Sequence, residues 1–476
     1  MQPNPLLIAD AWVETGQTSD VLNPWNGQLV GRVCVADRAL LDRAIAAAAG
    51  VFYRRKIQAP DERAAVLNRV AAGLQAQREA FAQTVVAEAG KPVSMARAEV
   101  DRAVITFTAA ADEARRMAGE TLDAAAFAPG RGHVAVVRRF PVGVVYGMTP
   151  FNFPLNLVAH KLAPALACGA PIILKPSPRT PLSTLKLAAL VKDCGALPGE
   201  VSVVNCPNDL ATYLINDPRV RAVSFTGSAA VGDTIKKLAV GKKLTLELGG
   251  NAAVIVDDYP DLKQAAAAIT AGAFGYAGQS CISVQRVLIQ MDQYETMREL
   301  LVEQARAVLT GDPSDEATIN GPMIDRAAQQ RVLSSIESAV AAGAKVLIGG
   351  GAVRGSDAPC VMPAILEDVP PDHPLWAEEA FGPVMVLKDY NEFIDALSWA
   401  NLSRYGLQAG VYTRNLDQMT QAFDMLEVGG VMINQPPTFR LDNLPYGGVK
   451  DSGVGREGPR WAIEEMTEPR VMILRQ

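Results

Sequence analysis

The sequence predicts an α/β fold in which a doubly wound, Rossmann-like parallel sheet is followed by a second α/β unit. Short apolar segments alternate with helical ones from Val142 to Leu248, which is typical of βαβ units whose sheet is covered on both faces. Apolar residues make up 49% and charged residues 20% of the chain, so a sizeable core can form. The length of 476 residues exceeds the usual ~100–200 of one domain, which predicts more than one folding unit.

The chain before residue 120 is expected to be mainly helical, because apolar residues recur at three- and four-residue spacing. The clearest helices are predicted at 64–88 and 94–117, with the breaker Gly90-Lys91-Pro92 between them. The β-rich segment 132–139 then predicts a strand. A second alternating stretch starts near Asn251, and the cleft between the two units is the expected place for a ligand.

Composition excludes several classes of protein. The formal net charge is −6, from 45 Lys and Arg against 51 Asp and Glu, which argues against a nucleic-acid or membrane-binding surface. The first residues lack a basic leader and a sustained apolar stretch, and the six cysteines lie far apart without a CxxC pair. We therefore expect a cytoplasmic protein in a reducing environment. The three histidines have no ligand-like spacing, so no metal site is expected.

Two segments carry candidate dinucleotide contacts. A predicted strand runs through Gly227-Ser228 to Gly232 at the start of a helix, where backbone N–H groups attract a pyrophosphate. Lys175 stands at the carboxyl end of a strand, where open α/β sheets bind ligands, and its ammonium suits ribose hydroxyls or a phosphate. The alternatives are an ordinary strand-to-helix turn and a solvated lysine.

Three residues carry candidate chemistry. Glu247 ends a strand before Gly249-Gly250, and burial there would raise its pKa toward that of a general base. Cys281 follows Gly278-Gln279-Ser280 and precedes a predicted helix or turn, and the pKa of its thiol would be lowered if backbone N–H groups there point at the sulfur. The Asn152 amide, at the carboxyl end of another strand, suits a developing oxyanion. A surface acid, a core cysteine and a turn asparagine are the respective alternatives.

Seven motifs follow one another along nearly the whole chain. They are FNFP (151–154), LKPS (174–177), FTGS (225–228), LELGG (246–250), GQSC (278–281), EEAFGP (378–383) and PYGGVKDSGVGREG (445–458). In this order they resemble the aldehyde dehydrogenase superfamily. The last motif and the residues after it resemble the branch that contains lactaldehyde and phosphonoacetaldehyde dehydrogenases.

The resemblance implies oxidation of an aldehyde to its acid, with hydride passing to NAD or NADP. Cys281 would attack the aldehyde carbon, and the Asn152 amide with the Cys281 N–H would hold the oxyanion of the thiohemiacetal. Glu247 would activate water to hydrolyse the resulting thioester, and Glu457 matches the family's second proton-relay glutamate. Acyl transfer to coenzyme A and a non-catalytic binding protein are the alternatives, and the presence of these residues disfavours both.

The resemblance also assigns cofactor contacts. Lys175 matches the adenosine-ribose lysine, Ser228 the pyrophosphate contact, and Glu379 the nicotinamide-ribose carboxylate, with Phe381 packing nearby. The expected set is completed by Met148, Thr149, Pro150, Phe151, Ser177, Pro178, Arg179, Gly227, Gly232, Leu248 and Gly249.

The choice between NAD and NADP stays open. Many NAD-preferring members of the family have a glutamate where this chain has Pro178. Its loss removes the repulsion of a 2′-phosphate, and Ser177 and Arg179 would even favour that group.

Substrate contacts are predicted from the same resemblance. Arg102 matches an arginine that binds anionic substrate groups in some relatives, with a structural ion pair on its helix as the alternative. His160 and Arg440 are candidates for the mouth of the pocket, with core packing as the alternative for His160. The set is completed by Phe153, Ser280 and Ile282. We expect a short aldehyde that bears a hydroxyl or an anionic group.

The family architecture implies domain bounds. Residues 1–120 and 142–247 would form the dinucleotide-binding domain and 248–450 the catalytic domain, while 121–141 and 451–476 would form a small β oligomerisation arm and the C-terminal tail. The arm would pair strands near 133–139 and 470–474. The expected partners are an aldehyde, a dinucleotide and further copies of the chain in a homodimer or homotetramer.

Overall fold

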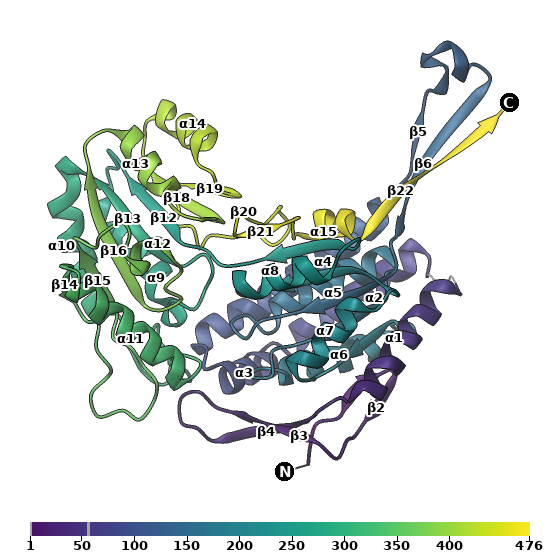
Figure 1. Ribbon diagram of the computed structural model, residues 1–476, viewed down its shortest axis with the longest axis horizontal. Helices are drawn as coiled ribbons and strands as arrows, with labels where there is room; N and C mark the ends of the chain where they lie inside the picture. Colours follow the sequence, from purple (N-terminus) through teal and green to yellow (C-terminus); the bar gives the residue numbers. More distant parts are fainter. Residues whose placement is uncertain (1, 55–57) are drawn as a thin grey trace.

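The computed structural model describes residues 2–54 and 58–476, which form two large sheets and a projecting arm (Figure 1). Across the first sheet the strands are β21 (Gly453–Val454), β11 (Lys243–Glu247), β10 (Val220–Thr226), β7 (Val144–Met148), β8 (Ile172–Lys175) and β9 (Val201–Val203). All neighbours in this sheet are parallel except the β11–β21 pair. The predicted α/β class with a doubly wound cofactor sheet is confirmed.

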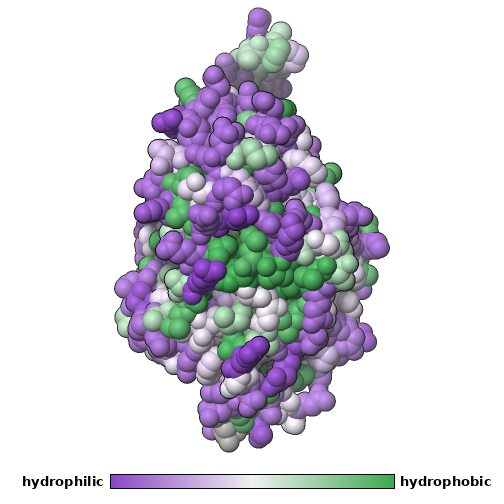
Figure 2. All heavy atoms as spheres, turned by 90° about the vertical axis from the view of Figure 1, so that its left-hand side faces the viewer, coloured by the Kyte–Doolittle hydropathy of each residue, from purple (hydrophilic) through white to green (hydrophobic). Residues whose placement is uncertain are grey.

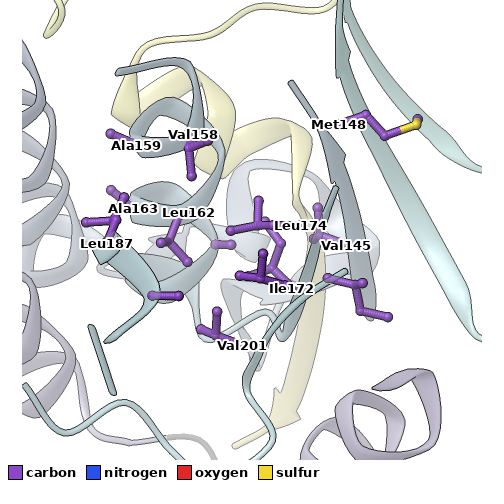
Figure 3. Packing of buried hydrophobic residues seen from close by; sticks show 14 of the residues in the cluster. Val145, Met148, Val158, Ala159, Leu162, Ala163, Ile172, Leu174, Leu187 and Val201 are labelled. Atoms are coloured by element: carbon purple, nitrogen blue, oxygen red, sulfur yellow. The ribbon is translucent and has the colours of Figure 1, made fainter. Parts of the chain in front are cut away.

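The first sheet is held by a large apolar core. Helix α5 (Asn156–Cys168) is buried along its whole length and packs beside β7 and β8. Figure 3 shows Leu162 of α5 and Ile172 and Leu174 of β8 in one cluster. Because successive apolar residues point to both faces of these strands, the sheet needs a cover on each side, and the helices supply it.

The second sheet has the strand order β14 (Lys345–Ile348), β15 (Ala364–Glu367), β16 (Val384–Tyr390), β13 (Val284–Gln290), β12 (Ala252–Val256), β18 (Gln408–Tyr412) and β19 (Gly430–Ile433). Two separate apolar clusters lie against it, and one of them includes residues of α9 (Leu262–Phe274) and α10 (Met291–Ala307). The second alternating stretch predicted after Asn251 is therefore present as a second α/β unit.

The arm is a three-stranded antiparallel sheet, in which β6 (His133–Pro141) lies between β22 (Thr467–Arg475) and β5 (Glu120–Leu122). Figure 1 shows it extending away from both large sheets. The predicted pairing is confirmed by the register, in which Arg470 lies opposite Arg138. Residues 451–466 lie outside this sheet, since β21 joins the first sheet and α15 (Pro459–Glu465) packs against α5. The domain bounds and the role of the arm stay predictions.

Two expectations for the first part of the chain were wrong. Residues 6–34 form short strands, β1 (Leu6–Ile8), β2 (Ala11–Val13), β3 (Thr18–Leu22) and β4 (Leu29–Cys34), in two antiparallel pairs. The single helix expected at 64–88 is two helices, α2 (Pro60–Ala76) and α3 (Arg78–Ala89), because the chain turns at Gln77. Helix α4 (Val93–Arg116) follows the prediction closely.

The surface on the side of the second sheet is mostly hydrophilic, with one apolar patch near its centre (Figure 2). Among the described residues, no helix has both the length and the apolar character needed to cross a membrane.

Candidate active site

A cavity of about 320 Å³ opens between the two large sheets. It is lined by Arg102, Pro150, Phe151, Asn152, Phe153, Asn156, Leu157, Thr226, Gly227, Ser228, Glu247, Leu248, Gly249, Cys281, Arg331, Glu379, Phe381, Arg440 and Tyr446. Most of these residues follow the carboxyl ends of β7, β10 and β11, which is where open α/β sheets bind ligands. The cavity therefore collects the three candidate catalytic residues Asn152, Glu247 and Cys281.

Cys281 lies in the turn between η3 (Gly275–Gly278) and β13. The chain reaches it through Tyr276 and Ala277, whose φ angles of 52° and 54° are unusual for residues with side chains. Buried Gln279 fixes this turn, because its side chain accepts the Ile324 N–H at 2.8 Å. Strained backbone held by such anchors is common at reactive sites.

The environment of the thiol differs from the expectation. The turn leads into a strand rather than a helix, so no helix N-terminus points at the sulfur. Burial raises the pKa of Cys281 to about 12, and the hydrogen bond between Sγ and the Tyr446 hydroxyl, at 3.3 Å, opposes that rise. The pKa is raised rather than lowered, because desolvation outweighs the Tyr446 hydrogen bond.

Glu247 ends β11 and is buried, with neither carboxylate oxygen hydrogen-bonded to a described residue. Burial and then the charge of Glu457 raise its pKa well above the usual range, as expected for a candidate base. Glycines around it keep space open: a Cβ at Gly447 would lie 2.7 Å from its Oε1, and one at Gly250 would lie 2.0 Å from the Cys281 carbonyl oxygen. The double glycine after Glu247 thus lets the Cys281 turn approach.

Asn152 lies after β7 and is buried. Its Nδ2 donates to the Gln279 carbonyl oxygen at 2.9 Å, which leaves the second N–H of the same amide for another acceptor. The amide is therefore attached to the turn that carries Cys281.

Glu457 does not line the cavity, although it lies close enough to raise the pKa of Glu247. Its carboxylate accepts from Lys161 at 3.0 Å and from Arg440 at 3.3 Å. Although burial opposes ionisation, Lys161, His160 and Arg440 lower its pKa to about 2. Lys161 and Arg440 therefore favour the ionised form of Glu457 behind the cavity.

One wall of the cavity carries two arginines joined by a buried carboxylate. Arg102 on α4 donates from Nε and Nη2 to the two oxygens of Asp442, each at 2.9 Å. The Arg440 Nε lies 3.6 Å from Asp442, and its Nη2 contacts the His160 Nε2 at 3.1 Å. His160 is fully enclosed and lies 2.7 Å from Asp442, so it supports the wall without lining the cavity. Arg102 lines the cavity and is also ion-paired, with Asp442 rather than with a residue of its own helix, and its contact with a substrate stays a prediction.

The predicted cofactor residues divide into two groups. Near the cavity, Ser228 is the N-cap of α8 (Ala229–Leu238) without a side-chain capping bond, which leaves the first turn of the helix available for an anion. Glu379 accepts the Gly250 N–H at 3.0 Å, and burial raises the pKa of this carboxyl to about 7. The Phe381 ring packs edge-on against Phe151, with the centroids 6.0 Å apart. These groups fit the phosphate and nicotinamide ends of a dinucleotide.

The second group lies away from the cavity. Lys175 ends β8, and burial lowers the pKa of its ammonium. Arg179 points toward the second α/β unit, where its Nη2 donates to the Asp325 carboxylate at 2.8 Å. The predicted residues that do not line the cavity are Met148, Thr149, His160, Lys175, Ser177, Pro178, Arg179, Gly232, Ser280, Ile282 and Glu457.

Several residues of the site were not predicted. Tyr446 contacts the sulfur, Asp442 joins the two arginines, and Arg331 donates to the carbonyl oxygens of Ala380 and Phe381. Only Tyr446 stood within a recognised motif, beside two glycines that mark a close approach. Within residues 2–54 and 58–476, no cluster of three or more potential metal ligands occurs.

The sequence matches the aldehyde dehydrogenase family over residues 12–472. The chain is 38% identical over 470 residues to the 3-sulfolactaldehyde dehydrogenase of Priestia megaterium, which covers 98% of this chain and 97% of that protein. It is 34% identical over 474 residues to the lactaldehyde dehydrogenase of Methanococcus vannielii, with 98% and 99% covered.

Solved structures agree with this relationship. Aldehyde dehydrogenase 21 of Physcomitrella patens, in complex with the reaction product succinate, has a TM-score of 0.96 at 38% identity, covering 100% of this chain and 99% of that one. Glyceraldehyde-3-phosphate dehydrogenase of Methanocaldococcus jannaschii, complexed with NADP, has a TM-score of 0.91 at 34% identity, with 97% and 100% covered. A betaine aldehyde dehydrogenase variant of Staphylococcus aureus, in complex with NAD+, has a TM-score of 0.95 at 28% identity, with 100% and 98% covered. The chain therefore belongs to the aldehyde dehydrogenase family of NAD(P)-dependent enzymes, as the order of its motifs predicts.

Proposed function

We propose that this enzyme oxidises a short aldehyde that carries an anionic group, using NAD or NADP, and releases the carboxylic acid. The observation that carries the substrate class is the wall formed by Arg102 and Arg440. Arg102 and Arg440, with Lys161 behind them, face the two ionised carboxylates Asp442 and Glu457. This wall therefore keeps one net positive charge, which suits a carboxylate or sulfonate. The sulfolactaldehyde and succinate named for the relatives carry such groups, which supports the proposal.

In the proposed reaction, the Cys281 thiolate attacks the aldehyde carbon and forms a thiohemiacetal. The second N–H of the Asn152 amide and the Cys281 backbone N–H donate to the oxyanion. Conversion of the thiohemiacetal to a thioester releases a hydride, for which a bound nicotinamide would supply the acceptor. Glu247 then removes a proton from water, which attacks the thioester carbon and returns the thiol.

The cofactor would be held at both ends by residues of this chain. Ser228 and the first turn of α8 would take the pyrophosphate, Lys175 the adenosine ribose and Glu379 the nicotinamide ribose. The ion pair between Arg179 and Asp325 would have to open before Arg179 could meet a 2′-phosphate, so neither NAD nor NADP is favoured by this pair alone.

We also propose the domain bounds implied by the resemblance and a homodimer or homotetramer assembled through the arm. Its strand β22 exposes Val471, Met472 and Ile473 by 52–63%, a degree unusual for a row of apolar residues without a partner. All six cysteines are unpaired, which supports a cytoplasmic location.

The substrate class is tested with two aldehydes of equal chain length, succinic semialdehyde and butanal, each assayed with NAD and with NADP. We expect kcat/KM to be roughly 10- to 100-fold higher for succinic semialdehyde, because a hydrogen-bonded charge pair favours the anion. Arg102→Leu should remove most of this preference through KM. Arg116→Leu, at the exposed end of the same helix, is the matched control. Equal kcat/KM for the two aldehydes in the wild type would contradict the proposal.

A further inference from the structure

Tyr446 lies in direct contact with the atom that would react. Its hydroxyl oxygen is 3.3 Å from the Cys281 sulfur, and no other side chain among the described residues is hydrogen-bonded to that sulfur. The tyrosine is buried in a small apolar cluster with Ile282 and Leu407, and Cys281 packs against it. In such surroundings a hydrogen bond to a charged group is stronger than in water.

The position of the ring is fixed by the backbone. The Tyr446 N–H donates to the Glu457 carbonyl oxygen at 3.1 Å, and the Glu457 N–H donates back at 2.7 Å. This short antiparallel bridge holds the tyrosine against the segment that follows β21, the edge strand of the first sheet. The main chain that places the hydroxyl near the sulfur is therefore fixed.

The face of the same ring is covered by a cation. The guanidinium carbon of Arg440 lies 3.5 Å from the ring centroid, close enough for a cation–π contact. A positive charge over the ring draws electron density from the phenol, which makes its O–H a better donor. Burial and the nearby Cys281 raise the pKa of Tyr446 well above 10, so the hydroxyl keeps its proton.

We propose that Tyr446 is a catalytic residue whose O–H donates a hydrogen bond to the Cys281 thiolate, with Arg440 strengthening that donor from behind the ring. This inference rests on the proposed function, in which Cys281 is the nucleophile. When the thiol ionises, the S–H bond breaks, the electron pair stays on Sγ and the proton leaves to water. The phenol is not consumed, since it donates a hydrogen bond and keeps its O–H bond.

The role also explains how a partly buried thiol without a helix N-terminus could react. Burial, with the nearby charges of Glu379 and Glu247, raises the pKa of Cys281, and the Tyr446 hydrogen bond is the largest effect that opposes this rise. A phenol is suited to this task, because it adds no net charge beside the carboxyl groups of Glu247 and Glu379. Phenylalanine would fill the same space without the donor.

The test compares Tyr446→Phe with the wild type in alkylation by iodoacetamide, with the modified peptide identified by mass spectrometry. At each pH between about 7 and 10, we expect the alkylation rate constant of Cys281 to be roughly three- to tenfold lower in Tyr446→Phe than in the wild type. This range combines a pKa rise of about one to two units with the higher nucleophilicity of a more basic thiolate. The value of kcat/KM for the aldehyde should fall in parallel, while dinucleotide affinity stays unchanged.

Tyr412→Phe is the matched control, because Tyr412 is equally buried but its hydroxyl has no hydrogen-bond partner among the described residues. Equal alkylation rates for Tyr446→Phe and the wild type, with kcat/KM also unchanged, would overturn the role of Tyr446 and leave Cys281 as the nucleophile. If wild-type protein alkylated fully at Cys281 still oxidised aldehydes, the proposed function itself would fail, and this inference with it.

Discussion

Two buried carboxylates near the same cavity are treated in opposite ways. Asp442 accepts two hydrogen bonds from Arg102 and one from Asn156, and it contacts His160, so its negative charge is fully compensated. Glu247 is equally buried but has no hydrogen-bond partner among the described residues. Although burial alone would raise it, His160 and Arg102 hold the pKa of Asp442 below its usual range, whereas that of Glu247 is raised.

The difference separates positioning from chemistry. A satisfied carboxylate is rigid and fixes the groups around it, here the two arginines of the proposed anion site. An unsatisfied carboxyl costs folding energy, but it remains free to accept a proton from water. The cavity therefore has one wall built for stability and another that gives up stability for reactivity.

The largest effect on activity is expected from a substitution in the part of the cavity that carries Cys281 and Glu247. Cys281→Ala should lower aldehyde oxidation by about 10⁴-fold or more, because no other group can form the covalent intermediate. Dinucleotide affinity, measured by calorimetry, should stay unchanged. Cys194→Ala, at a partly buried cysteine outside the cavity, serves as the control. Retention of wild-type turnover by Cys281→Ala would show that Cys281 is not the nucleophile.

Most of the candidate catalytic residues could be predicted from the sequence. Asn152 and Glu247 each follow a strand of one parallel sheet, and such strand ends meet along a single edge. The motif around Cys281 completed the set through the family resemblance. The raised pKa of the thiol could not be foreseen, because it depends on how tightly distant segments enclose the sulfur.

The contacts of the wall that contains Arg102 and Arg440 could not be predicted from the sequence. Arg102 and Asp442 are 340 positions apart, and His160 and Asp442 are 282 apart, so spacing along the chain says nothing of their contact. The strands at residues 6–34 were missed for a related reason, since strands of three to six residues show too few alternations to predict. The turn at Gln77 has no glycine or proline to mark it.

A smaller effect, on stability, sharpens the comparison. Asp442→Asn should lower the free energy of unfolding by about 2 kcal/mol, because the half-buried Arg102 guanidinium loses the carboxylate that accepts its two hydrogen bonds. Glu247→Gln should raise it at neutral pH, because the change removes a buried carboxyl whose raised pKa costs folding energy there. Denaturant unfolding at neutral pH measures both.

The pH dependence gives this comparison a second check. The pKa of Asp442 is lowered from 3.8 in the folded protein, so its contribution is present above that value and is lost as the pH falls. The difference in the free energy of unfolding between Asp442→Asn and the wild type should therefore become smaller at acidic pH. An equal loss of stability in both variants would mean that the two carboxylates do not differ as described.

The central claim, that Cys281 forms a thioester which Glu247 hydrolyses, is tested most directly by intact mass spectrometry of Glu247→Gln mixed with aldehyde and dinucleotide. We expect one acyl adduct on Cys281 per chain, one equivalent of reduced cofactor, and almost no further turnover. In the wild type, hydrolysis should accelerate as the pH rises, because the raised pKa of Glu247 delays formation of its carboxylate. Steady turnover by Glu247→Gln at the wild-type rate, with no adduct on Cys281, would contradict the account.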